Sequence, residues 1–238
     1  MNTAKNTWWD ESICEGGSLV DLVMKMYCTN VLGALDVLRT PENCKSSFSF
    51  SDKQKESSSE FKIISIKPIW QYPLKNYVRE RGIDLGMKYL EEAYYKTYSN
   101  QEKPFFAVAF RNDKGGYELR SKHFKGSLSP KYIRTIPGRE NSLNIFEGFF
   151  DYLSALTYFR TIDLKNKTIV LNSTSNIPYV EEAVKNAIDV FCFLDNDESG
   201  IKAFEKIRKW NANAVNQSAI LYPGYNDFND FICKKRKT

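Results

Sequence analysis

Histidine is almost absent from this chain, since His123 is the only one among 238 residues. This removes most mechanisms that need a histidine base and most metal sites built from several histidines. No apolar run is long enough to span a bilayer, and the first residues, MNTAKNTWWDES, lack the apolar core of a signal peptide. These absences predict a cytoplasmic protein without a membrane partner.

Cysteine gives no metal or disulfide framework either. The chain has five cysteines, an odd number, with wide spacing and no C-x-x-C motif: Cys14, Cys28, Cys44, Cys192 and Cys233. We therefore expect neither a disulfide framework nor a zinc site formed by this chain alone.

The composition allows a sizeable core and contact with polyanions. Hydrophobic residues make up 42% of the chain and aromatic residues 14%, which argues against global disorder. The net charge is +5 and the pI about 8.8, a mildly basic balance. Basic residues gather in 103–139, whereas carboxylates gather at 195–198 and 227–230.

Shifts in composition divide the chain into four regions. Apolar residues with helical spacing come first, then a serine-rich polar linker, then a small α+β subdomain, and last a longer α/β domain. We expect helices over 17–39 in the first region. The four regions are 1–40, 41–60, 61–139 and 140–238.

The small subdomain combines helical and strand patterns. Residues 77–95 predict helical segments that are broken near Gly82. A strand at 105–110, a turn at 112–116 and a second strand at 117–120 together predict a β-hairpin.

The last region alternates apolar strands with helices, which predicts right-handed β-α-β crossovers and an α/β fold. The strands are continuous apolar runs, as expected when helices cover both faces of a mostly parallel sheet. We expect four strands, at 143–146, 168–171, 190–194 and 219–222, flanked by helices at 148–160, 179–187, 199–211 and 228–235.

Acidic residues follow two of these strands. Glu147 comes directly after 143–146, and Asp195 and Asp197 follow 190–194. Sites in open α/β sheets lie at the carboxyl ends of strands, and residues two apart in an extended segment point the same way. The three carboxylates are therefore candidate ligands for Mg²⁺ or Mn²⁺, which would stabilise phosphoryl or nucleotidyl transfer. Alternatively, the D-N-D-E-S-G segment is only a polar turn that caps the next helix.

Both acidic segments resemble motifs of the Toprim domain family. Residues 145–151, IFEGFFD, are similar to its glutamate motif, in which an apolar strand leads to Glu-Gly with an Asp four residues after the Glu. Residues 193–200, FLDNDESG, are similar to its D-x-D motif. The resemblance implies that Glu147 is an acid/base or metal-linked residue, and that Asp195 and Asp197 are metal ligands.

Residues 225–230, YNDFND, resemble a later acidic segment of bacterial primases and their phage relatives. The resemblance implies a further metal ligand at Asp227, with Asn229 in place of the family's second acid and Asp230 beside it. Asp151, in the helix after the glutamate motif, matches a supporting position. A helix N-cap is the alternative role for Asp227 or Asn229, and a dipole-satisfying carboxylate is the alternative for Asp151.

The region before the Toprim motifs also resembles bacterial primases. Residues 77–83, YVRERGI, are similar to the start of their small subdomain, and the hairpin over 106–120 is similar to a segment that lines their template groove. The resemblance implies single-stranded DNA and nucleoside triphosphates as partners, held by cations on phosphates and aromatic rings on bases. A solvated β surface is the alternative. The basic candidates are Arg111, Arg120, Lys122, Lys125, Lys131 and Arg134.

Residues 9–23 resemble the end of a primase zinc ribbon, where Gly-Gly precedes an amphipathic helix. Only Cys14 lies in a ligand-like place, so Met1 would fall midway through the module, and we expect a zinc ribbon remnant without zinc. The chain also ends soon after the Toprim segment, so we expect no helicase-interacting domain. Short zinc-ribbon/Toprim proteins of Bacteroides-type mobile elements are similar, which implies replication or mobilisation and a replicative or element-encoded helicase as a partner.

Three functions follow from these patterns. The preferred one is primer synthesis on single-stranded DNA by a primase-like nucleotidyltransferase. The second is a non-catalytic DNA-binding accessory protein derived from a primase, which the missing zinc ligands and Asn229 favour. The third is a Toprim nuclease, in which water attacks the phosphodiester with the help of the same acids.

Overall fold

The computed structural model describes residues 7–10, 15–27, 31, 35, 38, 61–97 and 100–235. The chain divides into two compact units, Met1–Ser58 and Ser59–Thr238. The expected linker over 41–60 lies outside the described residues, as do Cys14, Cys28 and Cys44.

In the first unit a short hairpin leads into a helix. Strands β1 (Thr7–Asp10) and β2 (Glu15–Ser18) pair antiparallel, and α1 (Leu19–Tyr27) follows directly. The helix begins with a reciprocal cap, because Asp21 Oδ2 accepts hydrogen bonds from the amide and hydroxyl of Ser18 at 2.7 Å, while the Asp21 amide donates to Ser18 Oγ at 3.4 Å. The expected helical segment therefore starts at Leu19.

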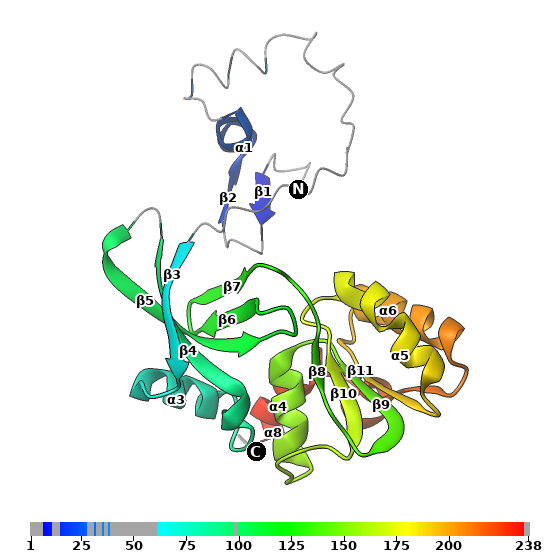
Figure 1. Ribbon diagram of the computed structural model, residues 1–238. Helices are drawn as coiled ribbons and strands as arrows, with labels where there is room; N and C mark the ends of the chain where they lie inside the picture. The colour runs from blue at the N-terminus through cyan, green and yellow to red at the C-terminus, as the bar shows by residue number, and fades with distance from the viewer. Residues whose placement is uncertain are drawn as a thin grey trace. The chain divides into compact units, whose positions relative to one another are not determined.

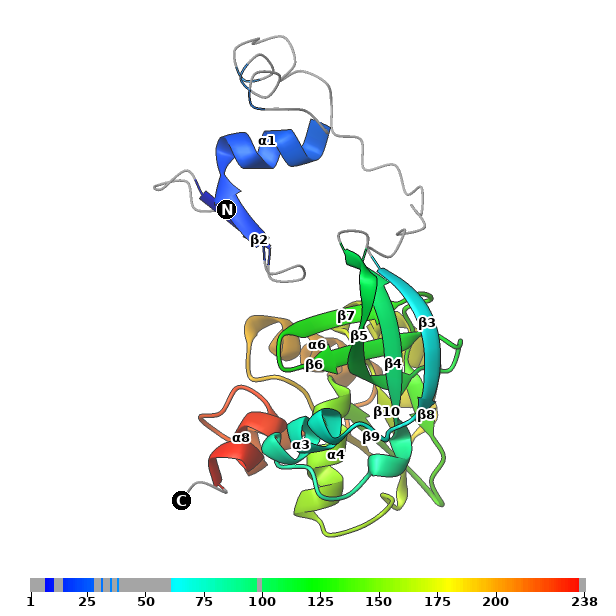
Figure 2. The same cartoon turned by 90° about the vertical axis from the view of Figure 1, so that its left-hand side faces the viewer.

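The second unit begins with an antiparallel sheet in the order β3-β4-β5-β6-β7 (Figure 1). The predicted hairpin is confirmed as β5 and β6, in which Val108 pairs with Arg120 and Arg111 with Tyr117. Helix α3 (Tyr72–Glu80) packs beside this sheet (Figure 2). The strands are β3 (Phe61–Pro68), β4 (Leu90–Thr97), β5 (Asn100–Arg111), β6 (Tyr117–Ser121) and β7 (Phe124–Leu128).

The prediction of helix up to residue 95 is wrong. After α3 the chain turns at Gly82, which has a φ of 74°, passes through a single 3-10 turn, η2 (Met87–Tyr89), and enters strand β4. Tertiary pairing overrides the local pattern here, because β4 lies between β3 and β5 and hydrogen-bonds to both.

The remaining residues form a mostly parallel sheet in the order β12-β11-β9-β10-β8. The predicted α/β fold is thus confirmed, with four parallel strands and a fifth, β8, added antiparallel at one edge. The strands are β8 (Arg134–Ile136), β9 (Glu140–Phe146), β10 (Asn166–Val170), β11 (Val190–Phe193) and β12 (Ala214–Asn216).

Helices cover both faces of this sheet (Figure 1). On one face α4 (Phe149–Tyr158) and α8 (Phe228–Lys235) pack on Phe146, Val170 and Phe193. On the other face α5 (Glu181–Asn186), α6 (Glu198–Trp210) and the 3-10 segment η3 (Thr174–Val180) pack on Ile145, Ile169 and Cys192. Successive strand residues thus point into different cores, which explains their continuous apolar runs.

The expected fourth strand at 219–222 is wrong. The strand is β12, which ends at Asn216, and the next residues form helix α7 (Gln217–Leu221). The side chain of Asn216 accepts hydrogen bonds from the amides of Ser218 and Ala219, so it ends the strand and caps the helix.

One hydrophobic core joins the antiparallel sheet to the α/β part. The rings of Phe110 on β5 and Phe149 on α4 are stacked at 5.0 Å, and Leu74 and Val78 of α3 belong to the same buried cluster. Among the described residues, no helix is long and apolar enough to cross a membrane.

Candidate functional site

Two acidic residues lie where the order of the parallel strands reverses. From β9 the chain goes to β10 on one side and then to β11 on the other, so β9 and β11 are neighbours with Phe146 paired to Phe193. Glu147 and Asp195 follow the carboxyl ends of these two strands. In open α/β sheets this reversal opens a crevice that binds ligands, so the topology brings both residues to the place expected of a site.

The two residues are in direct contact. Glu147 Oε2 accepts a hydrogen bond of 3.2 Å from the backbone amide of Asp195. Burial raises the pKa of Asp195 to about 8, and the negative charges of Asp151, Glu147, Asp227 and Asp197 add to this effect. Burial also raises the pKa of Glu147. Five carboxylates are therefore close enough to repel one another.

Asp197 is exposed and has a structural task at the start of helix α6. Its Oδ1 accepts a hydrogen bond of 2.8 Å from the amide of Gly200, so it is the N-cap that the capping alternative predicts. Gly200 itself lies against the other acid, since a Cβ atom there would be 2.0 Å from the carbonyl oxygen of Asp195. The glycine that follows D-x-D therefore allows α6 to approach the Asp195 backbone.

Asp151 joins two helices of the domain. Its Oδ2 accepts from the Gly148 amide at 3.2 Å, and its Oδ1 accepts from the Asn229 amide at 3.1 Å. It is buried, and burial raises its pKa, with the charge of Asp227 adding to the rise. The dipole-satisfying carboxylate considered for this position is thus observed at the start of α4.

Asn229 is a buried donor, which accounts for an amide in place of an acid. Its Nδ2 donates to the carbonyl oxygen of Arg81 at 2.7 Å and to Ser154 Oγ at 2.9 Å. An ionised aspartate could not make the bond to the Arg81 carbonyl oxygen, because a carboxylate only accepts. Asn229 therefore connects α8 to α4 and to the turn after α3. This structural role differs from that of a carboxylate ligand.

The later acidic segment is tied to the D-x-D loop by Asn196. The amide of Asn196 donates to Asn226 O at 2.7 Å, and its Nδ2 donates to Tyr222 O and Tyr225 O at 3.2 and 2.8 Å. Asp227 follows directly and caps α8, with its Oδ1 accepting from the Asp230 amide at 2.5 Å. Asp230 itself pairs with Lys234 at 2.9 Å.

A divalent cation fits the charge of this cluster. Within the described part of the chain, no three His, Cys, Asp or Glu side chains are arranged around one point as a metal cage. Mg²⁺ rarely needs such a cage, because it keeps several waters and commonly binds through one or two carboxylates and the substrate phosphates. Glu147 and Asp195, joined by a hydrogen bond and both with raised pKa values, are the pair that a cation would relieve most directly.

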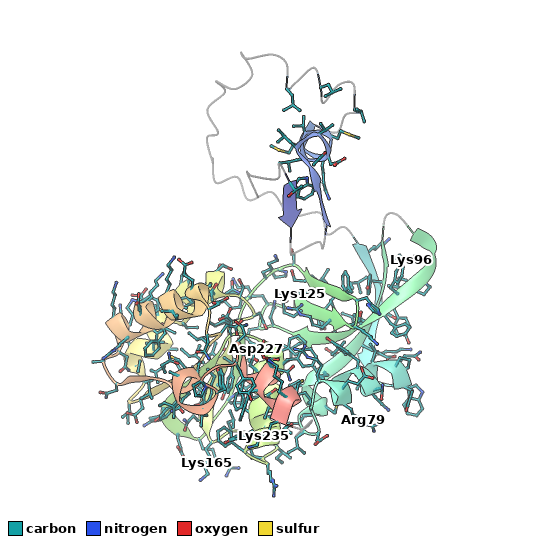
Figure 3. The ribbon with its side chains drawn as sticks, turned by 180° about the vertical axis from the view of Figure 1, so that it is seen from behind. Arg79, Lys96, Lys125, Lys165, Asp227 and Lys235 are labelled. Atoms are coloured by element: carbon teal, nitrogen blue, oxygen red, sulfur yellow. The ribbon has the colours of Figure 1, made fainter. Side chains whose placement is uncertain are left out.

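One of the predicted basic residues, Lys125, lies near the acidic cluster, and a second, Lys131, lies near Glu118. The charge of Lys125, on β7, opposes the rise in the pKa of Glu147, and Lys125 and Lys131 both oppose the rise that burial causes at Glu118. Figure 3 shows Lys125 and Asp227 where the antiparallel sheet meets the α/β part. A cationic strand therefore borders the acidic cluster.

The other predicted basic residues have different surroundings. Arg120 is held within the protein, since its Nη1 pairs with Glu118 at 3.2 Å and also donates to two carbonyl oxygens. Arg134 pairs with Asp113 at 3.7 Å and lines a separate hollow of about 420 Å³ together with Arg111. Lys122 is exposed at the turn between β6 and β7. The six residues thus do not form one continuous patch.

Sequence reasoning missed three residues that shape this region, namely Glu118, Arg81 and Asn196. Glu118 and Arg120 are two apart on β6 and so point the same way, and this opposite-charge spacing was the available signal. The charge of Arg81 lowers the pKa of both Arg120 and Asp151, as a minor contributor beside burial. The central residue of D-x-D, Asn196, gave no signal because its partners are 26 to 30 positions away in the sequence.

We compared the chain with known protein families to identify the class of α/β domain that has this fold and this acidic edge. Residues 144–232 match the family model described as Toprim-like, and the resemblance seen in the motifs is confirmed. Residues 63–129 match a second model, described as a domain of unknown function, DUF8464. No curated protein sequence matches the chain.

Two solved structures are similar in fold. The primase fragment of the bacteriophage T7 primase-helicase protein is 14% identical, with 68% of this chain and 66% of that fragment covered and a TM-score of 0.45. The zinc-binding and RNA polymerase domains of the Aquifex aeolicus primase are 16% identical, with 98% and 72% covered and a TM-score of 0.48. The chain thus spans just under two thirds of the T7 fragment.

Proposed function

We propose that this protein is a primase-like nucleotidyltransferase that synthesises primers on single-stranded DNA. In this reaction a 3′ hydroxyl forms a bond to the α-phosphorus of a nucleoside triphosphate, and pyrophosphate leaves. This reaction needs both a charge-stabilising centre for the triphosphate and a cationic surface for the template. The Toprim-like domain carries the first, and the antiparallel sheet beside it carries the second.

One observation supports this proposal above the others. Lys125 on the neighbouring sheet is close enough to Glu147 for its charge to oppose the rise that burial causes in the pKa of that carboxyl. A polyanion that lies on Lys125 would thus pass beside the carboxylates. Negative and positive groups at one crevice suit a reaction whose substrates are phosphates bridged by a divalent cation.

In the proposed reaction Mg²⁺ or Mn²⁺ would be held by Glu147, Asp195 and Asp197, with Asp227 as a further ligand. The bound ion would supply neutralisation of phosphate charge. Asp197 and Asp227 each use Oδ1 as a helix cap, which fixes the position of the carboxylate before an ion binds. Asp151 supports the site by a different route, since it holds α4 against α8.

The biological setting follows from the sequence resemblance. We propose a role in the replication or mobilisation of a mobile element, with a replicative or element-encoded helicase as a partner. The hairpin and helix of residues 7–27 have the element order of the end of a primase zinc ribbon, and we propose that they are its remnant without bound zinc.

The test is primer synthesis on single-stranded DNA with labelled ribonucleotides and Mg²⁺ or Mn²⁺, with the wild type beside Asp195→Asn. We expect metal-dependent products from the wild type and a loss of about 100-fold or more in the variant, because one preorganised charge at a reacting phosphate is removed. Glu205→Gln, on the exposed face of α6, is the matched control and should keep full activity.

Other outcomes would select the alternative functions. Intact and bound DNA without any synthesis by the wild type would overturn the proposal and favour an accessory DNA-binding protein. Shortened DNA, produced by the wild type and not by Asp195→Asn, would favour a nuclease that uses the same acids.

A further inference from the structure

A cavity of about 640 Å³ lies away from the acidic cluster, on the antiparallel sheet beside helix α3. Its walls come from Tyr77 of α3, Tyr95 of β4, Phe105 and Phe106 of β5, and Phe124 of β7. A volume of this size holds a small planar ligand, because ligand pockets commonly measure about 300–1,000 Å³. Five aromatic side chains around one cavity indicate a ligand that is itself flat and apolar on its faces.

Three rings of this cavity, those of Tyr95, Phe105 and Phe124, are arranged in near-parallel planes. Tyr95 is stacked on Phe124 at 4.7 Å with 25° between the planes, and on Phe105 at 5.7 Å with 29°. Tyr95 is buried, whereas Phe105 is 42% and Phe106 is 36% exposed. The stack is therefore anchored inside the protein at Tyr95 and reaches solvent at Phe105, where a further planar ring can be added.

The cavity also has polar lining residues, one of them a lysine. Lys122 and His123 line it from the turn between β6 and β7, and Glu80 lines it from α3. Aromatic walls beside a lysine suit a base with an attached phosphate, because the ring stacks and the phosphate meets Lys122. A purely apolar ligand would make no polar contact with Lys122, His123 or Glu80.

Two elements that line the cavity also lie near the proposed catalytic region. Lys122 and Lys125 belong to the same β6–β7 hairpin, and Lys125 is the cation that acts on Glu147. Tyr77 lines the cavity, and its ring contacts Phe150 of helix α4 edge-on at 5.8 Å. A strand that follows the hairpin would therefore reach from the cavity to the acids.

We propose that this cavity binds an unpaired nucleobase together with its adjacent phosphate, with Phe105 stacking on the base, Phe106 bounding the cavity from the next position of β5, and Lys122 contacting the phosphate. The proposal deepens the proposed function, since it names a second binding site on the same path of a single strand. It requires neither the metal nor the carboxylates.

The experiment measures binding of a fluorescently labelled decathymidylate to the full chain in EDTA by anisotropy. Phe105→Ala should weaken binding by about 5- to 150-fold, the loss expected for one stacked base. The control Phe159→Ala removes an aromatic ring of similar exposure, 46%, at the end of α4, and should bind like the wild type. Phe106→Ala provides a second pocket variant if Phe105→Ala alters the circular dichroism of the folded chain.

Two further arms decide what occupies the cavity. An abasic oligonucleotide should bind the wild type more weakly than decathymidylate does and should bind Phe105→Ala and wild type equally. Free 2-aminopurine riboside triphosphate tests a nucleotide in place of the strand. If its fluorescence is quenched by the wild type, if Phe105→Ala abolishes this quenching and if decathymidylate reverses it, a free nucleotide binds the cavity by the same stacking. Binding of both ligands to both pocket variants within twofold of the wild type would overturn the proposal.

The outcomes also separate this inference from the proposed function. Asp195→Asn should lose primer synthesis and keep full binding of decathymidylate in EDTA. If the protein makes no primers but Phe105→Ala still weakens DNA binding, the base site stands without the proposed function. If the protein makes primers but neither Phe105→Ala nor Phe106→Ala changes DNA binding, the base site is absent.

Discussion

The carboxylate of Glu147 accepts a hydrogen bond from the backbone amide of Asp195 across the two central strands of the parallel sheet. This bond fixes the loop after β11 to the end of β9, while the charge of Glu147 contributes to the raised pKa of Asp195. One side chain thus has a structural and an electrostatic effect on its neighbour, and the two effects can be separated by substitution.

Glu147→Gln should keep the hydrogen bond and lower the pKa of Asp195. The glutamine carbonyl oxygen still accepts from the Asp195 amide, whereas the negative charge that disfavours ionisation of Asp195 is gone. Carbon-13 NMR titration of labelled aspartate carboxyls would measure the change in metal-free buffer. An Asp195 pKa equal to or above that of the wild type would contradict the prediction, and Glu205→Gln is the neutral comparison.

Metal-free protein should lose stability as the pH rises from about 4 to about 8. Burial raises the pKa of Asp195 from 3.8 to about 8, so in this window the folded state holds a proton that the unfolded state has released. Mg²⁺ should reduce the loss at the upper end, since it stabilises the ionised form. Thermal unfolding across this range in EDTA and in Mg²⁺ measures both effects.

Asp195→Asn provides the control for the pH dependence, because an amide does not titrate. Its melting temperature in EDTA should change less between pH 4 and pH 8 than that of the wild type. Parallel curves for the two proteins would show that Asp195 is not the group responsible.

Asn229→Ala should destabilise the protein by about 1–3 kcal/mol, since its buried amide donates to Arg81 O and Ser154 Oγ. Asn229→Asp should destabilise it further at neutral pH, because the new carboxylate would face a carbonyl oxygen and lie near Asp151. Urea unfolding measures both changes. Asn213→Ala removes an exposed side-chain bond to Ile188 O and should cost less than Asn229→Ala.

Gly200→Ala should impair the site more than the small size of the added methyl group suggests. The added methyl group would lie 2.0 Å from the carbonyl oxygen of Asp195, so the D-x-D loop must move away from α6. We expect a loss of about 1–3 kcal/mol in stability from overpacking, together with reduced primer synthesis. Ile201→Ala, an exposed position in the same helix, is the comparison, and equal effects of the two substitutions would contradict the close approach.

Lys125→Gln should reduce the salt dependence of single-stranded DNA binding. One lost phosphate contact lowers the slope of log affinity against log salt by about 0.7. Lys165→Gln changes the charge equally at a position far from Lys125 in Figure 3 and should leave the slope unchanged. Affinity measured at several salt concentrations for both variants decides whether Lys125 contacts the strand.

The parts of the fold that could be predicted from sequence are those set by local pattern. Apolar runs over β9, β10 and β11 and the turn between β5 and β6 were sufficient to predict a mostly parallel sheet and a hairpin. Strand β4 could not be predicted, because its identity depends on pairing with β3 and β5 at distant positions. The same holds for α7, whose start is decided by the Asn216 side chain.

The acidic residues could be found from sequence because each follows an apolar strand, and parallel topology then places them together. The partners of the basic residues could not. Whether Arg120 is a free cation depends on the buried carboxylate of Glu118 beside it, and the role of Asn229 depends on Arg81, 148 positions earlier. Spacing along the chain carries no information about such long-range bonds.

Asn196 supplies three hydrogen bonds to residues 222–226, and so the loop that carries Asp195 and Asp197 is joined to the segment that leads to Asp227. The conformational entropy of these two loops is therefore lost when the chain folds, before any ion or phosphate arrives. Binding at this edge then carries a smaller ordering cost, so a larger share of the interaction with the ligand is retained as affinity.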